Sequence, residues 1–102
     1  MSFTGNESEE ITLAQATDWT AAYRTNNAGS VKAHFFGKTQ LMKILNQTNC
    51  AGIRAYYAID DAGVKQLVFV GADYNEKDLY NGVILERSSP CPNSCDPASP
   101  LY

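Results

Sequence analysis

The chain has 102 residues, of which 44% are hydrophobic and 19% charged, and its formal net charge at pH 7 is −3. A chain of this length forms one domain with one modest core, and its acidic balance argues against general nucleic-acid binding, which needs a basic surface. The sequence has no run near the roughly 20 apolar residues that span a bilayer, and no signal-peptide pattern. We therefore expect a cytoplasmic protein that binds neither membranes nor nucleic acid.

The first predicted helix follows a polar segment, residues 1–9, which we expect to be a flexible N-terminus. Thr12 followed three places later by Gln15 is typical of a capping box, and it predicts a helix that begins near Leu13. Asn26-Asn27-Ala28-Gly29 ends this helix, because asparagine and glycine tolerate the left-handed conformation.

The next segment is ambiguous. Residues 31–36 alternate as a short strand would, but they also fit an irregular lead-in to a helix, and Gly37 ends the run. Residues 38–47 predict a second helix, whose apolar stripe contains Leu41, Ile44 and Leu45.

The clearest predicted element is a β-hairpin over residues 52–72. Residues 53–59 alternate in the manner of a strand, Asp60-Asp61-Ala62-Gly63 is a turn, and residues 66–72 form the returning strand. Residues 83–87 form either a third strand or an irregular segment. The pattern predicts an α+β fold in which two N-terminal helices pack on one face of a small antiparallel sheet. We expect a single domain over residues 10–88, with residues 89–102 as an extended Pro/Cys-rich tail of the same domain.

The tail carries two of the three cysteines, Cys91 and Cys95, and all four prolines. Two cysteines are half of a zinc site, and Cys50 with His34 would complete a set of four only if the fold brought them together. A disulfide between Cys91 and Cys95 would close a very small loop and would be reduced in the cytosol, and thiol chemistry would need an activated thiolate. The remaining interpretation is a structural tail whose cysteines pack as small apolar groups. We expect no resident metal and no cofactor.

No catalytic set stands out. His34 is the single histidine, no acid lies within twenty-five residues after it, and the Gly-x-Ser-x-Gly elbow of many hydrolases is absent. The acids Asp60, Asp61 and Asp73 would act as catalysts only in a cleft, and we interpret them as solvated turn residues. The sequence therefore favours a non-enzymatic protein.

A binding surface is predicted on the central strand, where Arg54 and Tyr56 share one face. Arginine and tyrosine are typical of protein interfaces. If the helices cover the opposite face, with Ile53 and Tyr57, then Arg54 and Tyr56 either bind a partner or form the polar outer face of the sheet. We expect a protein that acts through protein–protein contact, as a homo-oligomer or with another protein. The alternative is a metal- or thiol-binding protein that uses the tail cysteines.

The ordered motifs resemble a group of short proteins from Bacteroidetes-type bacteria that end in a Cys-Pro-x-x-Cys tail. The matching segments are residues 19–24, 33–38, 50–57, 67–73 and 91–95. Members often have a second proline where this chain has Asn93, so the tail here is expected to be less stiff. The group has no established activity, so the resemblance implies one compact domain with a cysteine-bearing tail and no particular reaction.

Overall fold

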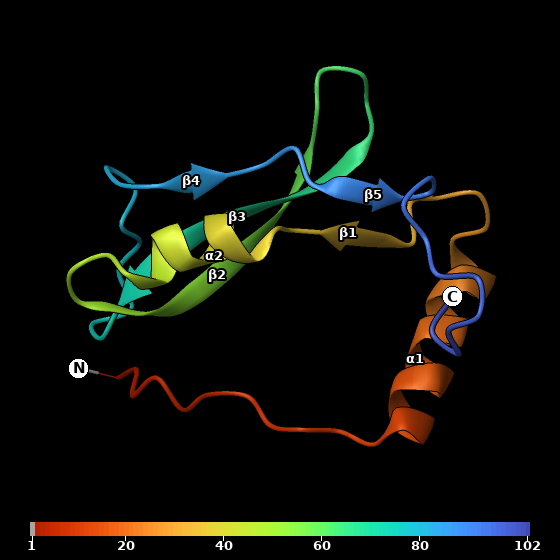
Figure 1. Cartoon of the computed structure of the whole chain (residues 1–102), viewed down its shortest axis with the longest axis horizontal. Coiled ribbons are helices and arrows are strands. Elements are labelled where there is room, and N and C mark those ends of the chain that lie inside the picture. The colour runs from red at the N-terminus through yellow and green to blue at the C-terminus, as the bar shows by residue number, and fades with distance from the viewer. Residues whose placement is uncertain (1) are drawn as a thin grey trace. The chain divides into compact units, whose positions relative to one another are not determined.

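The protein is an α+β structure built from two helices and two antiparallel sheets, as the computed structural model of residues 2–102 shows (Figure 1). The predicted fold class is therefore confirmed. The described chain divides into two compact units. One contains residues 2–7 and Phe36–Ser88, and the other contains Ser8–Phe35 and Ser89–Tyr102. We describe each unit by itself, and a single domain over residues 10–88 stays a prediction.

The first unit is built on the predicted hairpin, which is confirmed. Strands β2 (Cys50–Ile59) and β3 (Lys65–Asp73) pair antiparallel, with Tyr56 opposite Val68. The carboxylate of Asp60 accepts hydrogen bonds from two backbone N–H groups of the turn that joins the strands. Gly63 lies in the same turn at φ +81°, a conformation that glycine adopts without steric cost. The turn chemistry thus fixes the register of the hairpin.

A third strand, β4 (Ile84–Leu85), pairs with the other side of β3, where Phe69 lies opposite Leu85. The strand order is therefore β2-β3-β4, with β3 in the centre. This resolves the ambiguity of residues 83–87 in favour of a short strand. The apolar character of β3 agrees with cover on both of its faces, because Phe36 stacks on Phe69 on one face and Val70 on the other face is 4% exposed.

Helix α2 (Lys38–Leu45) packs on β2 and β3. Its Ile44 is fully buried, and a Cβ atom added at Gly71 would come within 3.2 Å of the Ile44 Cγ2 atom. Just before the helix, the ring of Phe36 stacks on that of Phe69 with centroids 3.9 Å apart. One part of the core of this unit therefore lies between α2 and one face of the hairpin, and the absence of a side chain at Gly71 permits the close approach. Val70 and Ala72, at 4% and 2% exposure, are buried on the other face of β3.

The second unit contains α1 (Leu13–Asn26), whose capping box between Thr12 and Gln15 is present as predicted. Tyr23 of this helix donates a hydrogen bond to the backbone carbonyl of Val31. Because α1 belongs to this unit, the expectation that both helices pack on the hairpin sheet is met by α2 and stays a prediction for α1.

The second unit also contains a two-stranded sheet, in which β1 (Ala33–Phe35) pairs with β5 (Ser89–Cys91). His34 lies opposite Pro90, so residues 31–36 do contain a short strand. Only the first three residues of the tail form a strand, and turns follow from Pro92 onward.

The buried position of Ile44 generates a stability prediction. Ile44→Ala should lower the free energy of unfolding by about 2–5 kcal/mol, since it removes a fully buried side chain and leaves a cavity against Gly71. Met42→Ala is the matched control, because Met42 lies on the same helix at 42% exposure and alanine is a good helix former. Urea denaturation of both variants measures the difference, and equal losses would contradict the packing described here.

Candidate functional site

The predicted binding residues Arg54 and Tyr56 meet a third side chain, that of Asp78, on one face of the hairpin. The Arg54 Nη1 atom lies 2.5 Å from Asp78 Oδ1, and the Tyr56 hydroxyl donates a hydrogen bond to the other carboxylate oxygen. Arg54 also donates to the backbone carbonyl of Glu76 at 3.1 Å. An isolated bridge between Ala72 and Asp78 holds the aspartate beside β3. Strand alternation and one turn therefore assemble a three-residue polar cluster.

The charges of this cluster stabilise one another. The hydrogen bond from Tyr56, followed by that from Arg54, holds the pKa of Asp78 below its usual value of 3.8. The same carboxylate raises the pKa of the Tyr56 phenol above its usual 10.0 and raises the pKa of Arg54 as well. At neutral pH the cluster is thus an ion pair with a neutral phenol. Its polar atoms are directed at one another, which favours a structural role for the arginine.

The N-terminal segment adds a further contact on this face. The N–H groups of Ser2 and Phe3 donate to the carbonyl of Tyr74, and the Phe3 ring centroid lies 5.4 Å from the guanidinium carbon of Arg54. A guanidinium within about 6 Å of an aromatic ring is attracted to its face. The Arg54 side chain is 30% exposed, whereas Tyr56 is 46% exposed. Of the two predicted binding residues, Tyr56 is therefore the more accessible to a partner.

The other face of the hairpin is partly uncovered. Tyr57 is 95% exposed and Ile59 is 72% exposed, and alternation along β2 puts both on the face that α2 covers at Ile53. The eight residues of α2 span about 12 Å, whereas the ten residues of β2 span about 33 Å. The helix is too short to reach the turn end of the hairpin. We call the exposed pair, Tyr57 and Ile59, the tip surface.

From strand alternation alone, Tyr57 was expected on the face that the helices cover, so the tip surface was not predicted. The lengths of the predicted helix and strand were the signal that could have revealed it.

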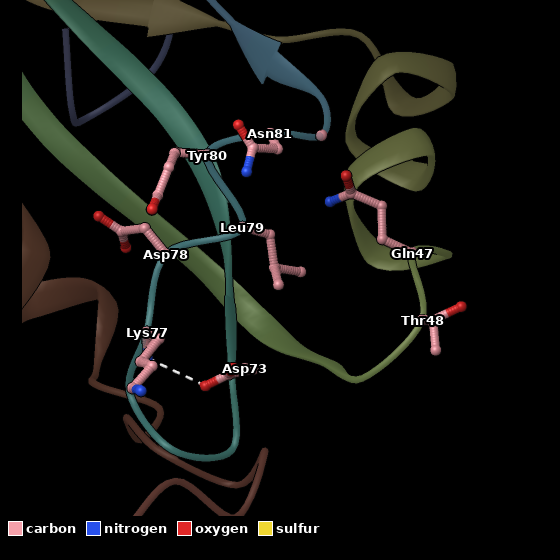
Figure 2. Close-up of a pocket in the computed structure, with 9 residues that line it drawn as sticks. Gln47, Thr48, Asp73, Lys77, Asp78, Leu79, Tyr80 and Asn81 are labelled. Carbon is pink, nitrogen blue, oxygen red and sulfur yellow. Dashed lines mark hydrogen bonds between the residues drawn. The ribbon is translucent and has the colours of Figure 1, made fainter.

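A hollow of about 440 Å³ lies beside the turn that carries Asp78 (Figure 2). It is lined by Gln47, Thr48, Asp73, Lys77, Asp78, Leu79, Tyr80, Asn81 and Gly82. The Gln47 amide bonds the carbonyl of Ile44 and the N–H of Val83, and Asp73 accepts from two backbone N–H groups of its own turn. Three of the polar side chains around the hollow, those of Gln47, Asp73 and Asp78, are thus engaged within the chain.

Two of the three candidate acids, Asp60 and Asp73, accept hydrogen bonds in turns, and the third, Asp61, is exposed. Besides its two backbone contacts, Asp60 accepts a hydrogen bond from the Gln66 side chain at 2.9 Å. The backbone N–H of Val64, first among these donors, lowers the pKa of Asp60. Asp73 accepts hydrogen bonds from two backbone N–H groups in the turn that follows β3. Both carboxylates stabilise loop conformations.

The tail cysteines are joined to each other. Cys91 and Cys95 form a disulfide with their Cα atoms 4.9 Å apart, and Cys50 is a free thiol in the hairpin unit. Of the four interpretations of the tail cysteines that the sequence left open, the structure therefore shows the disulfide. Within residues 2–102, no group of three or more histidine, cysteine or acidic side chains is arranged to hold a metal ion. In the same residues, neither helix has the length and apolar character needed to cross a bilayer.

The chain was compared with family models, curated proteins and solved structures, and none of them matches it.

The cluster predicts acid sensitivity. Asp78 and Asp60 have lowered pKa values in the folded state, so their stabilisation is present above the unfolded value near 3.8. It is lost as the pH falls through the lower folded values. Asp78→Asn should lower stability at neutral pH by about 1 kcal/mol and flatten the dependence on acid. Urea denaturation at a series of pH values measures both effects, with the exposed Asp61→Asn as control. If the stability of Asp78→Asn fell at low pH as steeply as that of the unaltered chain, the role given to Asp78 would be contradicted.

Proposed function

We propose that this chain is a non-enzymatic domain that acts through protein–protein contact, and that the tip surface is the contact site. The single observation that carries the proposal is the exposure of Tyr57 and Ile59, at 95% and 72%, side by side on one strand face. Interaction surfaces expose contiguous apolar side chains, and Tyr57 and Ile59 are neighbours on one strand face.

The chemistry of the tip surface supports this function. Tyrosine is enriched among the residues that dominate binding energy, because its ring buries a large area while its hydroxyl tolerates water. Tyr57 and Ile59 extend from a hairpin whose register and turn are fixed by hydrogen bonds. A rigid strand loses little conformational freedom when it binds, which favours affinity.

The predicted binding pair takes different roles in this proposal. Arg54 is a positioning residue, because its guanidinium bonds Asp78 and the carbonyl of Glu76. Tyr56 lies on the opposite face of β2 from the tip surface and is 46% exposed, with its hydroxyl donating a hydrogen bond to Asp78.

A double variant tests the proposal. Tyr57→Ser with Ile59→Ser should abolish association, whether with a second copy or with another protein, while stability changes by no more than about 0.5 kcal/mol. Tyr80→Ser is the matched control, since Tyr80 is also strongly exposed, at 70%, but lies outside the hairpin. Light scattering of the purified protein, and quantitative cross-linking capture in the source cells, measure association. Association that survives the double variant would refute this site.

The disulfide favours a second candidate function, reversible thiol chemistry at Cys91 and Cys95. Cys91 is buried at 5% exposure, whereas Cys95 is partly exposed, so an attacking thiolate reaches Cys95 first. Such a pair must be reduced by a physiological dithiol while the rest of the chain stays folded. Thiol counting after treatment with thioredoxin, alongside far-ultraviolet circular dichroism, tests this function. Reduction that unfolds the chain would assign the disulfide a structural role only.

The cellular compartment of the protein matters for both proposed functions, because it determines whether the tail cysteines are oxidised. We propose a cytoplasmic location, as the sequence analysis predicted, although structural disulfides are typical of oxidising compartments. Fractionation of the source cells, with thiol labelling of Cys91 and Cys95 in each fraction, decides between a reduced cytoplasmic form and an oxidised exported one.

A further inference from the structure

We infer that the partner at the tip surface is a second copy of this chain, which pairs antiparallel with β2 along its free edge. The three strands of each copy would then form one continuous sheet across a two-fold axis. This inference rests on the proposed function and names its partner. It is carried by the backbone of β2, by the position of the bonds that pair it with β3, and by the side chains that the pairing brings together.

The edge of β2 is open to a further strand. The order β2-β3-β4 leaves the outer side of β2 unpaired within the described chain. Natural edge strands are protected by proline, by inward charges, by bulges or by great shortness. Residues 53–59 contain no proline, and their single charge, Arg54, is held by Asp78. The only irregularity of the β2–β3 pair lies outside this stretch, between Cys50 and Gly52.

Two hydrogen bonds establish which backbone groups face outward. The Asp60 N–H donates to the Val64 carbonyl, so this pair next to the turn is a hydrogen-bonded one. Hydrogen-bonded and non-bonded pairs alternate along an antiparallel ladder. The bond from Leu79 N–H to the Gly71 carbonyl agrees, since it shows Gly71 directed away from β2. The N–H and C=O groups of alternate β2 residues therefore point to the free edge, and these are Ile53, Ala55, Tyr57 and Ile59.

The length of the free edge selects one register. At one end, a Cβ atom added at Gly5 would lie 3.5 Å from the Ala51 carbonyl oxygen, so the N-terminal segment runs beside β2 there. At the other end, the strand gives way to the turn at Asp60. The stretch between them, residues 53–59, has Tyr56 at its centre. Full overlap of two such stretches therefore places Tyr56 on the two-fold axis.

This register brings compatible side chains together. Each exposed Ile59 lies opposite Ile53 of the other copy, at the end of the sheet that α2 covers, and each exposed Tyr57 lies opposite the small Ala55. On the other face, Arg54 lies opposite Ala58, so no like charges meet. The pairing places the tip surface of each copy beside Ala55 and Ile53 of the other copy.

The expected complex is weak. Seven residues of paired strand, with two large side chains from each copy, bury less than a standard interface of about 1,600 Å². We therefore expect a reversible dimer with a dissociation constant in the micromolar range.

Matched substitutions at Ala55 test the backbone pairing. Ala55→Pro removes an N–H that points to the free edge while leaving the ladder with β3 intact, and Ala55→Ser keeps that N–H. In sedimentation velocity over a concentration series of the full chain, the unaltered chain and Ala55→Ser should both dimerise. Ala55→Pro should raise the dissociation constant at least tenfold. Equal dimerisation of Ala55→Pro and Ala55→Ser would overturn the inference.

Cross-linking tests the register and remains informative if Ala55→Pro fails to fold. In a Cys50→Ser background, Tyr56→Cys places two thiols on the axis with Cα atoms about 4.5 Å apart, within disulfide range. The control Ala58→Cys lies on the same face of the same strand, but the two copies of that position are about 13 Å apart. Oxidation should cross-link Tyr56→Cys and leave Ala58→Cys monomeric. Equal cross-linking at both positions, or at neither, would overturn the inference.

The outcomes separate this inference from the proposed function. In one outcome, the chain stays monomeric at high micromolar concentration but captures another protein, and the Tyr57→Ser and Ile59→Ser variant no longer captures it. This result would refute dimerisation with a second copy and would support the tip surface as the contact site. A chain that neither dimerises nor captures a partner through the tip surface refutes both.

Discussion

The close approach of Ile44 to Gly71 is the contact on which the hairpin unit depends. Helix α2 is only eight residues long, and Ile44 is its only fully buried side chain. A short helix gains little from its own hydrogen bonds, so its stability comes from packing. A side chain at Gly71 would occupy the space that Ile44 and the Cys50 sulfur now share, with contacts of 3.2 and 3.1 Å. The glycine of the central strand thus decides where the helix sits, and the helix decides which part of the sheet is covered.

Three carboxylates stabilise the turns of the sheet and the face that carries Arg54. Asp60, Asp73 and Asp78 each follow a strand or lie in a turn, and each directs its carboxylate at groups of its own chain. Acids that might suggest chemistry therefore stabilise turns and one cluster. The tip surface, in contrast, is apolar, and it lies where α2 cannot reach. Function and packing are connected here, because the same short helix that builds the core exposes Tyr57 and Ile59.

Local patterns predicted the local structure well. The capping box at Thr12, the hairpin and its turn, and the boundaries of α2 within two residues all follow from residue type and spacing. The pairing of β1 with β5 could not be predicted, because three-residue strands carry little periodicity and their partners lie more than fifty residues apart. Asp78 was missed for a similar reason. Arg54 and Tyr56 were placed on one face by alternation, but only the fold shows that an aspartate twenty-four residues after Arg54 meets them.

The two compact units are interleaved along the chain, and this has a consequence for biosynthesis. The chain passes between them three times, at residues 7–8, 35–36 and 88–89. The hairpin unit is complete once Ser88 has left the ribosome. Strand β1 cannot pair until β5 has emerged, and β5 follows Ser88 in the chain. Until then α1 and β1 are a nascent segment with an unpaired strand, the kind of species that chaperones recognise. Translation therefore imposes an order on folding, in which the hairpin forms first and the disulfide-bearing segment closes the second unit last.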